Sequence, residues 1–171
     1  MSMQDTASSG VALWRLVADG IERGIADGRE PHGRLIEASD DVATRELARE
    51  LGLKAGAPLV RIEAIRLADR TPICVSTTWL SAELFPGAGE VFAATRSMTK
   101  LLEHYGVRDY SRGATRITAG IVDATDAARL DLPLGRPILV VDATDLDPEG
   151  KPLVTKHSRF VAERVEFLVE P

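Results

Sequence analysis

The 171-residue chain contains an internal repeat, and this repeat constrains the fold more than any other feature of the sequence. Residues 46–80 and 126–160 align with an offset of 79, which becomes 80 from Pro72 and Pro152 onward. The residues that match are Leu51, Leu53, Gly56 and Pro58 in the first copy and Leu130, Leu132, Gly135 and Pro137 in the second. Each copy has the pattern of a short amphipathic helix, a Gly-x-Pro corner, a β-branched strand, a turn and a return strand. Two such units predict an α+β fold, in which one pseudo-symmetric, mainly antiparallel sheet carries helices on one face.

Hydrophobic periodicity and turn residues predict the remaining elements. Helices are expected over 11–27, from a cap at Asp40 or Asp41 to Leu51, over 97–105 with Ser97 as cap, and over 125–132 with Thr125 as cap. Strands are expected over 29–39, 58–67, 72–80, 110–122, 137–146, 152–161 and 164–170. Segment 81–91 has the composition of an irregular loop.

Composition excludes several classes of function. The net charge of −5 gives no overall attraction to nucleic acid. No segment reaches the ~18 apolar residues of a membrane helix, and residues 1–10 read as a disordered tail and not as a signal peptide, so we expect a cytoplasmic protein. The single Cys74 forms no intrachain disulfide, and the three histidines lack metal-ligand spacing. We therefore expect no metal and no cofactor.

Beyond the repeat, short motifs follow one another in a characteristic order. They are Leu51-Gly52-Leu53, Gly56-Ala57-Pro58-Leu59, Arg66-Leu67-Ala68-Asp69, Pro72, Leu101-Leu102, Tyr105-Gly106-Val107, Gly135-Arg136-Pro137-Ile138 and Asp147–Pro152. With these motifs, the chain from about Gly28 to Pro171 resembles the UTRA effector-binding domain of HutC-subfamily, GntR-type transcription regulators. The resemblance implies a chorismate-lyase-like fold, a ligand-binding domain over 29–171, a homodimer and a non-catalytic role.

Four further segments resemble repressors of phosphonate uptake and degradation within that family. They are Gly28-Arg29-Glu30-Pro31, Val107-Arg108-Asp109-Tyr110, Thr115-Arg116-Ile117-Thr118 and Ser158-Arg159-Phe160. The resemblance implies a small anionic effector, phosphonate- or phosphate-like.

The N-terminal segment departs from the family pattern. Residues 11–28 resemble the first helix of a winged helix-turn-helix domain, but no recognition helix or glycine-rich wing follows them. We expect a remnant of that domain, with DNA bound only through a winged helix that this sequence lacks. The alternative is that residues 11–28 belong to the effector domain itself.

Candidate effector ligands are cationic and hydroxyl side chains on the repeat strands, because guanidinium groups and hydroxyls bind oxyanions. The candidates are Arg66, Ser76, Thr78, Arg116, Thr118, Ser158, Arg159 and Phe160. Sugar-phosphate-binding relatives carry an arginine at Arg66 and a second one where this chain has Ala64. The pocket glutamate that the resemblance implies on the last repeat strand is Val154 in this chain, which argues against a sugar ligand.

Other interpretations remain open from the sequence. Surface ion pairs, solvent-facing hydroxyls and a core aromatic would explain the same residues without a ligand, and His157 reads as a structural histidine. At the level of function, the alternatives are a chorismate-lyase-like enzyme and a purely structural dimerisation module. No glutamate pairs obviously with Arg66 or Arg116 to support the enzyme.

Overall fold

The helices and strands come from a computed structural model that describes residues 14–17 and 32–168. The helices are α1 (Arg45–Leu51), α2 (Ala88–Thr95), α3 (Met98–His104) and α4 (Ala124–Leu130). The strands are β1 (Trp14–Val17), β2 (His32–Val42), β3 (Pro58–Ala68), β4 (Thr71–Ser81), β5 (Ser111–Ile121), β6 (Pro137–Leu146), β7 (Pro152–Val161) and β8 (Val165–Leu168).

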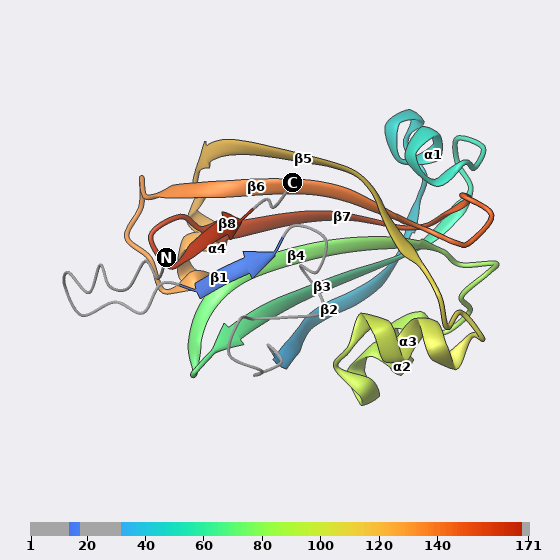
Figure 1. The fold of residues 1–171 in the computed structure, drawn as a ribbon, viewed down its shortest axis with the longest axis horizontal. Helices are drawn as coiled ribbons and strands as arrows, with labels where there is room; N and C mark the ends of the chain where they lie inside the picture. Colours follow the sequence, from blue (N-terminus) through green and yellow to red (C-terminus); the bar gives the residue numbers. More distant parts are fainter. Residues whose placement is uncertain (1–13, 18–31, 169–171) are drawn as a thin grey trace, which may run out of the picture.

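Six long strands form one antiparallel sheet in the order β2-β3-β4-β7-β6-β5 (Figure 1). The short strands β1 and β8 form a separate parallel pair. The α+β, mainly antiparallel fold expected from the repeat is therefore confirmed, and the two return strands β4 and β7 lie side by side at its centre.

The register of β4 and β7 reveals the symmetry of the repeat. Thr77 lies opposite His157, and an offset of 80 makes these two residues equivalent positions of the two copies. A local twofold axis therefore passes between them, normal to the sheet. It relates β3–β4 with α1 to β6–β7 with α4.

The sheet has two covered faces, which we call the α4 face and the α3 face. On the α4 face, the repeat helices α1 and α4 pack over two apolar clusters that include Leu59 and Val75. On the α3 face, α2 and α3 cover a cluster around Leu80, and β8 covers another around Cys74. The expectation that the helices of the two repeat units share one face of the sheet is thus confirmed, while α2 and α3, which lie outside the repeat, pack on the other face.

Helix α2 was not expected, since the sequence pattern predicted a loop over 81–91. It begins after Gly87, whose positive φ of 74° is a conformation that glycine adopts without strain. Only Ala88 and Phe92 of this helix are buried, so its apolar stripe is too short to be distinguished by periodicity.

Helix ends show which capping predictions succeed. Ser97 caps α3 and Gly52 ends α1 in the left-handed conformation, as predicted. Helix α1 is capped by Thr44 and not by Asp40 or Asp41, because β2 continues to Val42. Helix α4 is capped by Asp123 and not by Thr125.

The N-terminal expectation also changes. Where a helix over 11–27 was predicted, residues 14–17 form β1, which pairs with β8 of this domain. The other residues of that range, like the expected tail over 1–10, lie outside the described residues. The strand favours the alternative in which this segment belongs to the effector domain.

Candidate ligand-binding site

The eight candidate residues divide between the two faces of the sheet, because successive side chains of a strand alternate in direction. By register, Arg66, Ser76, Thr78, Ser158 and Phe160 lie on the α3 face. The other three, Arg116, Thr118 and Arg159, lie on the α4 face. Ser158, Arg159 and Phe160, although consecutive, therefore cannot contribute to one site.

Two cross-strand pairs form the centre of the α3 face. Ser76 lies opposite Ser158, and their hydroxyls share a hydrogen bond of 2.9 Å. Thr78 lies opposite Lys156 in the next pair of the same face. All four residues are buried, with exposures of 5–8%. We call Ser76, Thr78, Lys156 and Ser158 the polar strip.

Apolar residues surround the polar strip at both ends. Beyond the Thr78–Lys156 pair, Leu80 and Val154 belong to the cluster under α2 and α3. Beyond the Ser76–Ser158 pair, Cys74 and Phe160 belong to the cluster under β8. Burying hydroxyl and ammonium groups between two apolar clusters costs free energy that larger apolar side chains would not. The polar strip is therefore a candidate binding site.

Lys156 is a residue that the sequence analysis missed. Its ammonium lies 2.7 Å from Asp145 Oδ2, and Arg112 Nε lies 3.1 Å from Asp145 Oδ1. The lysine and aspartate side chains are 4% and 1% exposed. Asp145 Oδ1 has no aligned hydrogen-bond donor although Arg112 is close, so the carboxylate is held mainly by charge. A lysine two residues before Ser158 on the same face was the available signal.

Arg66 and Phe160 lie at the β8 end of the α3 face. Arg66 is half-buried opposite Cys74. Burial raises the pKa of the Cys74 thiol to about 11, and the positive charge of Arg66 acts against that rise. Phe160 is 1% exposed and packs edge-to-face on Phe167 of β8, so it serves the core.

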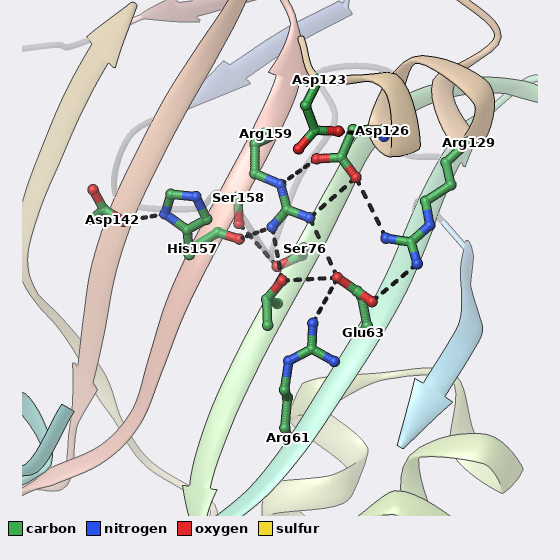
Figure 2. A network of polar contacts seen from close by, with 11 residues as sticks. Arg61, Glu63, Ser76, Asp123, Asp126, Arg129, Asp142, His157, Ser158 and Arg159 are labelled. Atoms are coloured by element: carbon green, nitrogen blue, oxygen red, sulfur yellow. Dashed lines mark hydrogen bonds and ion pairs between the residues drawn. The ribbon is translucent and has the colours of Figure 1, made fainter. Parts of the chain in front are cut away.

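The α4 face carries a different polar cluster, centred on Arg159 (Figure 2). Arg159 Nε donates to Asp126 Oδ2 of α4 at 2.8 Å. Its Nη1 donates to Thr77 Oγ1 at 2.8 Å and to the carbonyl of His157 at 2.9 Å. The guanidinium thus joins α4 to both central strands.

Glu63 is the second centre of that cluster. Its Oε1 accepts hydrogen bonds from Arg61 at 3.0 Å and from Thr77 at 3.3 Å, and Arg129 of α4 lies 3.2 Å from its Oε2. We call Arg61, Glu63, Thr77, Asp126, Arg129 and Arg159 the arginine network. Each of its two buried carboxylates contacts at least two guanidinium groups.

The arginine network forms part of the wall of a pocket of about 550 Å³. The other lining residues are Trp79, Gly120, Ile121, Asp123, Thr125, Ile138, Val140 and His157. His157 is paired with Asp142 Oδ1 at 2.6 Å. Arg116 and Thr118 are exposed on the edge strand β5, and neither lines this pocket.

Comparison with known proteins gives the family. The model of the UTRA domain matches residues 26–166, so the chain belongs to the UTRA domain family. It is 30% identical over 142 residues to an uncharacterised HTH-type transcriptional regulator of Rhizobium meliloti (strain 1021), a match that covers 83% of this chain and 58% of that protein. It is 26% identical to the HTH-type transcriptional repressor PhnF of Mycolicibacterium smegmatis, over 79% of this chain and 55% of that one.

Solved structures agree on the fold. The crystal structure of PhnF from Mycobacterium smegmatis superposes with a TM-score of 0.81 at 22% identity, covering 93% of this chain and 72% of that one. The chain spans a little more than half the length of the two curated relatives. In the parts of the chain that are described, no helix is both long and apolar enough to cross a membrane.

Proposed function

We propose that this chain is an effector-sensing, dimerising domain of a GntR-type bacterial transcription regulator. The observation that carries the proposal is the polar strip, which lies buried at the centre of a UTRA-family sheet between two apolar clusters. The two curated relatives are regulators of the HTH type, which supports a role in transcription and not in catalysis.

The chemistry of the strip favours a small anion with several oxygens. Three of its four side chains carry hydroxyl groups, and the fourth carries an ammonium group. Hydroxyl and ammonium donors that converge within a low-dielectric interior bind oxyanions well. A phosphonate or phosphate group presents three acceptor oxygens of the right kind. We therefore propose a phosphonate- or phosphate-like effector.

The pocket on the α4 face is the less favourable alternative. Its buried arginine, Arg159, already donates to Asp126, Thr77 and a backbone carbonyl. An incoming anion would have to replace two buried carboxylates at once, Asp126 and Glu63, and removing the partners of a buried ion pair is costly. We propose a structural role for Arg159, and a ligand role for Arg66, Ser76, Thr78 and Ser158.

Isothermal titration with inorganic phosphate and with methylphosphonate tests the site. We expect the double variant Ser76→Ala/Ser158→Ala to weaken binding about a hundredfold or more, because each of the two lost hydrogen bonds to a charged group is worth ~1.5–3 kcal/mol. The matched control is Ser81→Ala, another buried serine of β4, whose hydroxyl faces Leu84. Wild-type protein that binds none of these anions would refute the proposed function.

The regulatory part of the proposal has its own test. We propose that the domain forms a homodimer and that DNA is bound through a winged-helix domain and not through this sheet. Light scattering coupled to gel filtration should give twice the 18.5 kDa mass of the chain. A monomer at micromolar concentration would refute dimerisation without touching the ligand site.

A further inference from the structure

We infer that Lys156 reads the charge of the effector, with Asp145 as its built-in competitor, so that the site selects doubly charged anions over singly charged ones. This inference rests on the proposed function, since it concerns the same polar strip. It adds a residue and a ligand class to that proposal.

The position of Lys156 follows from the strand register. The Ser76–Ser158 pair is the middle row of the α3 face. Arg66 belongs to the row on one side, opposite Cys74, and Lys156 belongs to the row on the other side. Each row is about 7 Å from the next, because two residues of a strand span that distance. Both long cationic side chains can therefore reach an anion held by the two serine hydroxyls.

Lys156 supplies a cation on the face where this chain has Ala64 in place of the second arginine of some relatives. Ala64 lies opposite Ser76, and its methyl side chain is uncharged. Lys156 lies diagonally across the two central strands from Ala64, on the same face. An ammonium group is a point charge with rotatable donors, whereas a guanidinium prefers a fixed bidentate geometry. The site should therefore discriminate by charge more than by shape.

Asp145 explains why the charge of the ligand matters. Its carboxylate holds the Lys156 ammonium at 2.7 Å and lies near Arg112, yet one of its oxygens has no hydrogen-bond donor. An effector anion must compete with this carboxylate for Lys156. Coulomb attraction scales with charge, so a dianion attracts Lys156 about twice as strongly as a monoanion at the same distance. A monoanion therefore competes poorly with the Asp145 carboxylate for Lys156, whereas a dianion competes well.

Two isosteric probes test this selectivity. Methylphosphonate and methanesulfonate have the same tetrahedral shape, but at a pH where the phosphonate is doubly ionised only it is a dianion. We expect wild-type protein to bind methylphosphonate at least tenfold more tightly by titration calorimetry. Equal affinities for the two probes would overturn the inference, while the proposed function would survive.

Four variants test the residues. Lys156→Met should lose most of the affinity for methylphosphonate, and Lys156→Arg should recover part of it. Asp145→Asn should raise the affinity severalfold and narrow the preference over methanesulfonate, because the competing charge is gone. Arg61→Met is the control: it removes a partly buried cation of β3, on the opposite face, and should leave the affinity unchanged.

The outcomes separate a ligand role from a structural one. If Lys156→Met fails to fold, the double variant Asp145→Asn/Lys156→Met removes both charges of the pair and takes its place in the titration. A merely structural Lys156–Asp145 pair would leave Asp145→Asn with wild-type affinity, which would overturn the inference. Wild-type protein that binds neither probe would refute the proposed function itself.

Discussion

The two faces of β4 and β7 bury polar groups in different ways. On the α4 face, carboxylates and guanidinium groups match one another, and Arg159 is satisfied by Asp126, Thr77 and a backbone carbonyl. On the α3 face, the two serines bond to each other, and Asp145 contacts Lys156 and Arg112, although its Oδ1 has no aligned hydrogen-bond donor. Burial of polar groups is therefore not in itself the sign of a binding site. Under the proposed function, the matched charges of the α4 face are structural, and the hydroxyl groups of the α3 face bind the ligand.

The two repeats show the same divergence at equivalent positions. Trp79 and Arg159 are related by the offset of 80, and Leu47 and Asp126 by the offset of 79. In the first copy, Leu47 and Trp79 join an apolar cluster under α1. In the second copy, Asp126 of α4 forms an ion pair with Arg159. The backbone symmetry is kept while one helix is docked by apolar contact and the other by charge.

The strongest test of the comparison between faces is Arg159→Met. We expect the free energy of unfolding to fall by about 3 kcal/mol, because the variant leaves Asp126 and Glu63 buried with one cation fewer. Urea denaturation measures the change. The control is Arg116→Met on the exposed edge strand, which should stay within ~0.5 kcal/mol of wild type. If Arg159→Met also stays within ~0.5 kcal/mol of wild type, the arginine network contributes little to stability.

A second test uses Cys74, at the apolar end of the α3 face. Burial raises the pKa of its thiol from 9.0 to about 11 in the folded state. Because the unfolded thiol ionises first, its contribution to stability is full below pH 9 and is lost as the pH rises from 9 towards 11. Near pH 10.5 the loss reaches about 2 kcal/mol, because each tenfold change in the ionisation equilibrium corresponds to about 1.4 kcal/mol.

Urea denaturation at pH 8 and pH 10.5 measures this loss, with Cys74→Ala as the control. The variant should show a shallower fall over that interval, since other groups titrate in both proteins alike. An equal fall in the free energy of unfolding of both proteins would mean that the thiol has the same pKa in the folded and unfolded states. Water would then reach Cys74 at the β8 end of this face.

The smallest expected effect concerns equivalent helix ends in the two repeats. Gly52 ends α1 with φ of 64°, and Asp131 ends α4 at the equivalent position with φ of 54°. The left-handed backbone conformation is strained for residues other than glycine. Glycine, however, raises the conformational entropy of the unfolded chain, which offsets part of the gain. Asp131→Gly should therefore stabilise the protein by about 0.5 kcal/mol net, measured by thermal denaturation. The converse change, Gly52→Asp, should destabilise it, and a matching sign for both would contradict this interpretation.

Local patterns predicted most of the fold. The repeat predicted both hairpins, because Pro, Gly and β-branched residues recur at fixed spacing and act over a few residues. Segments with weak local signals were missed. Helix α2 buries only two side chains, and β1 is a strand because β8 lies beside it. Neither fact is visible in the periodicity of the segment itself.

The candidate site was predicted less well, for a reason of register. Ser76, Thr78 and Ser158 do lie together in the structure. Arg159 lies on the other face, and Lys156 and Asp145 were not identified at all. A single strand shows which residues alternate, but it does not show which face of the sheet receives the ligand or which strands lie next to each other.

The sequence by itself thus determined the two helix–hairpin units and their symmetry, since these depend on contacts between near neighbours in the chain. The tertiary structure alone decided that β4 pairs with β7 between residues about 80 apart, as between Thr77 and His157. That pairing places Lys156 beside Thr78 on one face and Arg159 beside Thr77 on the other. Where the repeats differ, long-range pairing decides which partner a charged side chain meets.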